Sequence, residues 1–164
     1  MARTAAPPRP EDAGLRGVSD PFRYLLRVRY GECDAQGIVF NARWGEYVDL
    51  AAGELTRRLF GGSDPVATDF DCRLVKQIME WHASARFDDV LDLRVRTLRI
   101  GTTSYATHTE VRRLSDGRHL ADCETIYVSV EVGTSIKRPV PPRHRAALEA
   151  GAPGVVVDHA GALT

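Results

Sequence analysis

Residues 30–40, Tyr-Gly-Glu-Cys-Asp-Ala-Gln-Gly-Ile-Val-Phe, join a stretch with strand periodicity to a stretch with helix periodicity. They place the carboxylate of Asp34 in a glycine-containing loop directly before the expected helix. The start of a helix presents unpaired backbone N–H groups and the positive end of the helix dipole. A carboxylate facing such donors across a small gap can attack a carbonyl, or activate a water to do so, while the donors stabilise the oxyanion. The loop therefore favours acyl chemistry.

The segments on either side of this loop have different hydrophobic periods. Before it, apolar residues occupy alternate positions from Phe22 to Tyr30, which predicts a half-buried strand. After it, apolar residues recur in steps of three and four and predict one helical stripe, made of Phe40, Trp44, Tyr47, Val48, Ala51, Leu55 and Leu59. We expect Asn41 to cap the start of this helix, and Gly61 with Gly62 to end it. Gly53 costs about 1 kcal/mol relative to Ala inside a helix, and close packing against a sheet would account for it.

Further along the chain the pattern is that of strands. Four strand-like segments run from Asp71 to Ala83, Val90 to Arg99, Thr103 to Leu114 and Arg118 to Val132. The Asp116-Gly117 dipeptide predicts a hairpin turn between the last two. A short helix is expected from Arg143 to Ala150. One strand, a long helix and four more strands define an α+β domain, in which an antiparallel sheet packs on the helix.

Composition sets the domain count and narrows the class of partner. The 164 residues suffice for one domain, with a Pro/Ala/Arg-rich extension at 1–20, the domain at 21–150 and a flexible tail at 151–164. Lys plus Arg and Asp plus Glu both number 22, so no net charge favours nucleic acid or an anionic membrane. Three cysteines without CxxC spacing favour reduced thiols. No apolar stretch is long enough to span a bilayer, and we expect a cytoplasmic protein.

Two blocks of sequence resemble a known family. Residues 30–40 followed by Asn-Ala-Arg-Trp at 41–44 resemble the signature loop of hotdog-fold acyl-CoA thioesterases of the 4-hydroxybenzoyl-CoA thioesterase and Tol–Pal-associated types. Residues 75–89 resemble the second strand of that family and the turn after it. The similarity extends from Leu25 to Pro142. It implies a hotdog fold, with a five-stranded antiparallel sheet wrapped around one long helix, in a homodimer or homotetramer whose sites lie at the dimer interface.

The resemblance assigns roles to the loop. It makes Asp34 the nucleophile or the general base, whereas the residue pattern alone also allows a carboxylate that merely caps the following turn or helix. It places the amide that polarises the thioester carbonyl at the helix start, with the backbone N–H of Asn41 as first candidate and that of Phe40 as second. Gly37 suits a position that needs positive φ or close approach to a ligand.

The resemblance also suggests residues that bind the substrate. Trp44 and Asp49 lie at acyl-pocket positions on the helix, although core packing explains Trp44, and solvent exposure explains Asp49, equally simply. Arg99 with Thr103 and Ser104, and separately Arg138, offer cationic and hydroxyl groups for the CoA phosphates; each group also fits a charged sheet edge.

The histidines indicate neither a metal site nor a dehydratase. His82 reads as a hydrogen-bonded strand residue, and His108 and His119 lack the spacing of a metal site. Hotdog dehydratases resemble a different motif with a catalytic histidine, which residues 30–40 do not contain. We therefore expect no metal and no cofactor, with CoA as part of the substrate.

These observations together predict an enzyme, an acyl-CoA thioesterase that hydrolyses acyl-CoA to free acid and CoA. Two alternatives stay open. One is a thioesterase for acyl groups on acyl carrier protein, which would need a basic surface patch. The other is a hotdog protein that binds acyl-CoA without turning it over.

Overall fold

A computed structural model describes residues 20–62 and 64–163, so nearly all of the predicted extension at 1–20 lies outside the described residues. The elements follow in the order β1 (Phe22–Arg27), a 3-10 turn η2 (Tyr30–Glu32), α1 (Arg43–Phe60), α2 (Pro65–Thr68), β2 (Asp71–Trp81), β3 (Val90–Ile100), β4 (Ser104–Arg113), β5 (His119–Val130), α3 (Pro142–Ala150) and β6 (Val156–Asp158). None of the described helices is long and apolar enough to cross a membrane.

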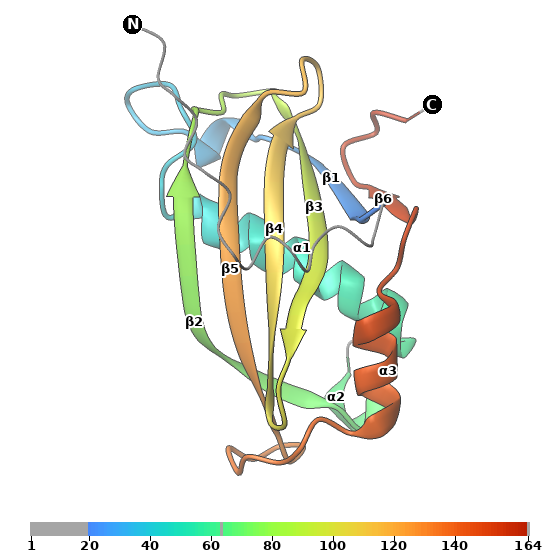
Figure 1. The fold of residues 1–164 in the computed structure, drawn as a ribbon. Helices are drawn as coiled ribbons and strands as arrows, with labels where there is room; N and C mark the ends of the chain where they lie inside the picture. Colours follow the sequence, from blue (N-terminus) through green and yellow to red (C-terminus); the bar gives the residue numbers. More distant parts are fainter. Residues whose placement is uncertain (1–19, 63, 164) are drawn as a thin grey trace, which may run out of the picture.

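The strands form one sheet that packs on the long helix, as expected for a hotdog fold (Figure 1). The strand order is β2-β5-β4-β3-β1-β6, and every neighbouring pair is antiparallel except β1 with β6. The turn predicted at Asp116-Gly117 is present, with Gly117 at a φ of 68° and Arg113 N–H bonded to the Arg118 carbonyl at 2.9 Å. The predicted α+β architecture is confirmed.

The sheet has six strands where the sequence predicts five. The additional strand, β6, pairs with β1 and lies in the segment predicted as a flexible tail. Valines 155–157 are β-branched residues that suit a strand, and β6 covers the otherwise free edge of β1. The Asp158 carboxylate holds the following turn by accepting the N–H groups of Ala160, Ala162 and Leu163 at 2.7–2.8 Å.

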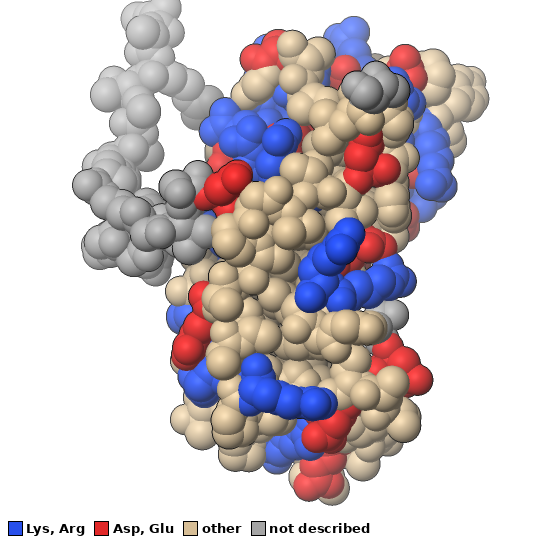
Figure 2. Space-filling model, turned by 90° about the vertical axis from the view of Figure 1, so that its right-hand side faces the viewer, with Lys and Arg blue, Asp and Glu red and all other residues tan. Residues whose placement is uncertain are grey.

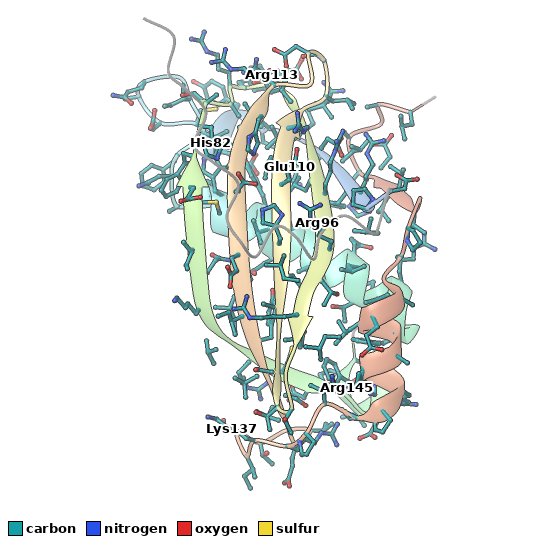
Figure 3. The ribbon with its side chains drawn as sticks, in the orientation of Figure 1. His82, Arg96, Glu110, Arg113, Lys137 and Arg145 are labelled. Atoms are coloured by element: carbon teal, nitrogen blue, oxygen red, sulfur yellow. The ribbon has the colours of Figure 1, made fainter. Side chains whose placement is uncertain are left out.

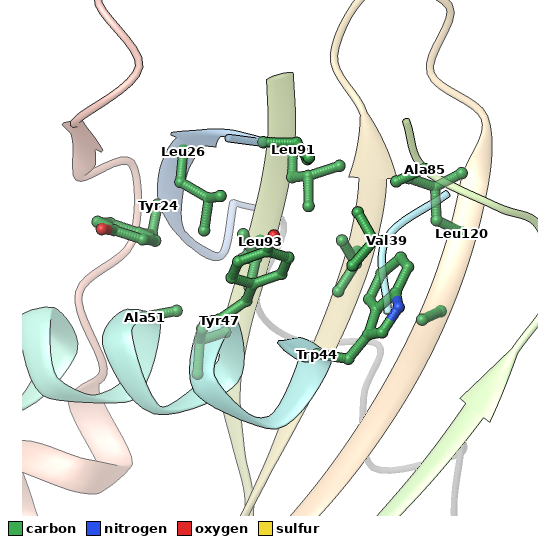
Figure 4. Packing of buried hydrophobic residues seen from close by; sticks show 14 of the residues in the cluster. Tyr24, Leu26, Val39, Trp44, Tyr47, Ala51, Ala85, Leu91, Leu93 and Leu120 are labelled. Carbon is green, nitrogen blue, oxygen red and sulfur yellow. The ribbon is translucent and has the colours of Figure 1, made fainter. Parts of the chain in front are cut away.

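Helix α1 buries one stripe against the sheet. Trp44, Tyr47, Val48, Ala51 and Leu55 face inward, and most of them join residues of β1, β3 and the loops in the main core cluster (Figure 4). The predicted stripe is thus confirmed over most of its length. Its first member, Phe40, is 48% exposed because it precedes the helix.

Three expectations at this helix and the strand before it are wrong. The N-cap is Ala42 and not Asn41, because a turn that bonds Arg43 N–H to the Phe40 carbonyl at 2.9 Å delays the first helical residue. Gly53 does not approach the sheet, since a Cβ there would meet no atom within 4 Å. Tyr30 does not continue the buried face of β1: it is 81% exposed, because the chain leaves the strand for the 3-10 turn.

Candidate active site

The loop between η2 and α1 folds back on itself and presents Asp34 at its base. Asp34 N–H donates to the Ile38 carbonyl and Gly37 N–H to the Asp34 carbonyl, both at 2.9 Å. Gly37 has a φ of 71°, which confirms the need for glycine at this position. The Asp34 carboxylate accepts the Gln36 N–H through Oδ1 at 2.8 Å. Within the described chain its second oxygen has no hydrogen-bond donor, so the half-buried carboxylate is oriented yet able to react.

Glu32 ties this loop to the helix. Its Oε2 accepts the phenol of Tyr47 at 2.8 Å and the Arg29 N–H at 2.7 Å, and its carbonyl accepts the Phe40 N–H at 2.9 Å. Burial, reinforced by the bond to this carboxylate, raises the pKa of Tyr47 well above its ordinary value. Tyr47 therefore stays a proton donor to Glu32. Glu32 lies two residues before Asp34 in the sequence, but only the fold shows that it anchors the loop.

Of the two backbone amides expected to polarise the carbonyl, one has no hydrogen-bond acceptor among the described residues. The Phe40 N–H is used by Glu32 and is unavailable. By contrast, the Asn41 N–H donates to no group among the described residues. Asn41 also lines a pocket of about 330 Å³, together with Ile38, Trp44, Trp81 and His82 among others. The amide is thus accessible from a cavity at the positive end of α1.

The pocket beside Asn41 does not include Asp34. Asp34 belongs to the same loop as Ile38 and Asn41 but lines none of the described pockets. Trp81, the last residue of β2, lines this pocket and is 53% exposed.

The two residues predicted for an acyl pocket are divided between two cavities. Trp44 is 3% exposed, so it is a core residue that also borders the pocket at Asn41. Asp49 borders a second, mainly apolar cavity of about 310 Å³ between α1 and the sheet, where Gly53 and Tyr127 also lie. Burial raises the pKa of Asp49. Hence Trp44 and Asp49 do not face one common pocket within the chain.

The residues predicted to bind phosphate lie at the other end of the sheet. Arg99 is at the end of β3 and bonds Glu124 at 2.7 Å, while Thr103 and Ser104 begin the return into β4. Arg138 donates to the Asp69 carbonyl at 2.6 Å. In Figure 3, Lys137 and Arg145 mark this end of the sheet, and His82 marks the end that carries the Asp34 loop. Within one chain, the predicted phosphate contacts and Asp34 therefore lie at opposite ends of the sheet.

Three histidines surround Asp122 of β5, and the sequence pattern did not predict that they lie together. His82 Nε2 and His119 Nε2 each lie 2.9 Å from Asp122 Oδ2, and His108 Nε2 lies 3.0 Å from Oδ1. Burial of Asp122 would raise its pKa, but the three imidazoles outweigh this and lower it. The residues come from β4, from β5 and from the position directly after β2, so only the strand pairing reveals the cluster. The His119-x-x-Asp122 spacing was the sole local signal.

The fold and the loop define a thioesterase of the hotdog class, and the comparisons with known proteins agree. Residues 36–119 match the model of the thioesterase superfamily, and the chain belongs to that family. It is 27% identical over 112 residues to the acyl-CoA thioester hydrolase YbgC of Escherichia coli O6:H1, an alignment that covers 67% of this chain and 82% of YbgC.

Solved structures show the same fold. A thioesterase superfamily protein from Jannaschia sp. CCS1 superposes with a TM-score of 0.75 at 19% identity, over 91% of this chain and 99% of that one. A 1,4-dihydroxy-2-naphthoyl-CoA thioesterase from Synechocystis gives a TM-score of 0.70 at 18% identity, over 77% and 94% of the two chains.

Proposed function

We propose that this protein hydrolyses acyl-CoA thioesters, with Asp34 as the reacting carboxylate and the Asn41 N–H as the donor to the carbonyl oxygen. The observation that carries the proposal is the loop itself. It holds a carboxylate with one unbonded oxygen on the same short turn as an unpaired amide at the start of α1. Membership of the thioesterase superfamily, and the activity in the name of the relative YbgC, support the same reaction.

Two routes use these groups. As a nucleophile, Asp34 forms a C–O bond to the thioester carbon and CoA leaves as a thiolate, which takes up a proton; water then cleaves the mixed anhydride to the free acid and restores Asp34. As a general base, Asp34 removes a proton from water, whose oxygen attacks the same carbon; the C–S bond then breaks, and the departing CoA thiolate takes the proton from Asp34. In both routes the Asn41 amide stabilises the negative oxygen. Neither route needs a metal or a redox cofactor.

We further infer that a second copy of the chain completes the site along β2. This 11-residue strand is one edge of the described sheet, and the three-residue β6 is the other. Four of its apolar side chains, Leu74, Val75, Ile78 and Trp81, are 43–58% exposed. A long apolar edge strand is a template for pairing with another strand. The edge also borders the pocket beside Asn41, which Trp81 lines.

Such pairing would also reunite the predicted site residues. A two-fold axis normal to the sheet makes the two β2 strands antiparallel, so the start of one strand meets the end of the other. The end of the sheet with Arg99, Thr103, Ser104 and Arg138 in one subunit then approaches the Asp34 loop of its partner. We propose that CoA phosphates bind there and that the acyl group enters the cavities beside Asn41 and Asp49, past Gly37 and Phe40.

The cysteines bear on the cellular compartment of the enzyme. Cys33, Cys72 and Cys123 are all free, which suits a reducing compartment, and we propose the cytoplasm. On the face seen in Figure 2, basic side chains occur in separate groups beside acidic ones. On this face, the mixture does not form the broad basic patch that a carrier protein would need.

The test is release of free CoA thiol from short, long and aromatic acyl-CoAs, with acyl carrier protein thioesters assayed in parallel. We expect Asp34→Asn to keep the fold and to lose at least ~100-fold in turnover. Asp116→Asn is the matched control, because Asp116 Oδ1 accepts the N–H two residues ahead at 3.0 Å, as Asp34 does. Near-normal turnover by folded Asp34→Asn would refute the role of Asp34. Saturable acyl-CoA binding without turnover by the wild type would favour the non-catalytic alternative.

The dimer has a separate test in light scattering at defined concentration. We expect Val75→Lys combined with Ile78→Lys to dissociate the dimer, since both residues are exposed on the β2 edge. Val66→Lys, on α2 and 76% exposed, is the control and keeps the wild-type mass. A wild-type monomer that is fully active would contradict the shared site while leaving hydrolysis by Asp34 intact.

A further inference from the structure

We infer that His82, His119 and Asp122 form a binding site for a divalent transition-metal ion, with Zn²⁺ as the expected occupant. The three ligand atoms, two imidazole nitrogens and one carboxylate oxygen, all lie within 4.8 Å of one another. The site adjoins the pocket beside Asn41, which His82 also lines, but none of its three ligands takes part in the reaction proposed at Asp34.

Backbone pairing holds the ligands together. Asp122 lies within β5, and His119 begins that strand. The carbonyl of Leu120, at a register shift between β4 and β5, accepts the N–H groups of both His82 and Ala83 at 2.8 and 3.1 Å. These two hydrogen bonds to one carbonyl fix the chain after β2 beside the start of β5. The rings of His82 and His119 consequently have centroids only 4.4 Å apart. The ligands are therefore arranged before any ion arrives.

The geometry requires only a small adjustment for an ion. A tetrahedral Zn²⁺ with bonds of about 2.1 Å holds its ligand atoms roughly 3.4 Å apart. Both imidazole nitrogens are now 2.9 Å from Asp122 Oδ2, so an opening of about half an ångström per contact would admit the ion. The side chains of His82 and His119 are 41% and 36% exposed, so the cluster lies at the protein surface.

One of the three ligand atoms, Nε2 of His119, lacks a hydrogen-bond partner among the described residues. His119 Nε2 is buried and forms no hydrogen bond of acceptable geometry within the described part of the chain, although it is 2.9 Å from Asp122. A buried polar nitrogen without a partner costs free energy. A metal ion on its lone pair would satisfy it.

The surroundings also favour a cation. Asp122 pairs in register with Glu80 of β2 and Glu110 of β4, so three carboxylates lie in a row across neighbouring strands. Negative charge close to a site attracts a cation, although Glu110 is itself paired with Arg112. His108 contacts the other oxygen of Asp122 at 3.0 Å and would orient the carboxylate, as outer partners of metal ligands do. Two imidazoles and a carboxylate select a borderline transition metal over Mg²⁺ or Ca²⁺.

The experiment uses untagged full-length protein freed of metal by a chelator, so that no added histidines contribute. Co²⁺ is titrated and followed by its visible absorption bands, and Zn²⁺ is then added as competitor. We expect one equivalent of Co²⁺ to bind with micromolar or tighter affinity and to be displaced by Zn²⁺, whereas Mg²⁺ has no effect. Absence of saturable Co²⁺ binding would overturn the proposal.

Variants assign the ligands. His82→Gln and His119→Gln should each weaken Co²⁺ binding by at least ~100-fold, and His108→Gln by about 10-fold to 100-fold. His159→Gln is the matched control, because His159 is an exposed histidine bonded to Tyr24 and outside the cluster. Circular dichroism confirms that each variant is folded. Unchanged Co²⁺ affinity in His82→Gln or His119→Gln, or an equal loss in His159→Gln, would refute the assignment.

Discussion

The phenol of Tyr47 on α1 donates a hydrogen bond of 2.8 Å to the carboxylate of Glu32 in the η2 turn. This bond joins the helix to the loop two residues before Asp34, and burial keeps the phenol protonated by raising its pKa. The position of the reacting carboxylate relative to the helix start thus depends on a contact between residues that do not themselves react.

Loss of this contact should affect stability and rate together. We expect Tyr47→Phe to lower the free energy of unfolding by about 1–3 kcal/mol, because Glu32 loses a donor in a partly buried place. We expect kcat to fall while KM changes little, because the loop carrying Asp34 loses one anchor. Urea denaturation and CoA release measure the two effects. A variant with wild-type stability and kcat would show that the bond contributes neither.

Gly37 should tolerate no side chain, for a reason of backbone conformation alone. A Cβ at Gly37 would meet no atom within 4 Å, but its φ of 71° is unfavourable for other residues. Gly37→Ala should cost about 1–2 kcal/mol. Gly53→Ala is the matched comparison, since Gly53 is helical and equally open, and it should stabilise by about 1 kcal/mol. Equal effects of the two changes in urea denaturation would contradict this explanation.

The buried ion pair of the sheet should matter far more than an exposed one. Asp92 on β3 is 1% exposed and accepts two bonds from Arg23 of β1, at 3.0 and 2.8 Å. Asp92→Asn should cost about 3 kcal/mol, because it removes the partner of a half-buried guanidinium. Asp88→Asn removes the exposed partner of Arg27 and should cost less than about 1 kcal/mol. Thermal unfolding of the two variants tests this order, and a reversed order would refute it.

His144 should make the protein less stable in acid. It is 2% exposed, stacks on Phe70 with ring centroids 4.6 Å apart and bonds the Thr68 carbonyl at 3.1 Å. Burial lowers its pKa in the folded state, so the unfolded chain binds the proton more readily, and stability falls as pH drops through about 6.5. Between pH 7.5 and 5.5 the wild type should lose more free energy of unfolding than His144→Gln, which stays neutral. Parallel pH profiles for the two proteins would exclude the effect.

Much of the fold and the central loop could be predicted from sequence because the signals are local. The apolar steps after Phe40 predict α1, the alternation near Leu91 and Ile126 predicts strands, and Asp116-Gly117 predicts a hairpin, since each depends on neighbours a few residues away. Gly37 likewise revealed its positive φ through its residue type. The resemblance of residues 30–40 supplied the family, which the match to the thioesterase superfamily confirms.

Only the tertiary structure decided how distant residues meet. It joined His82, His108 and His119 around Asp122 through strand pairing, added β6 to the edge of β1, and used Glu32 to occupy the Phe40 amide while leaving that of Asn41 free. Hydrophobic periodicity records which face of an element is buried, whereas sheet order and register determine what each face contacts. Side chains far apart in the chain therefore become neighbours only once the strands are paired.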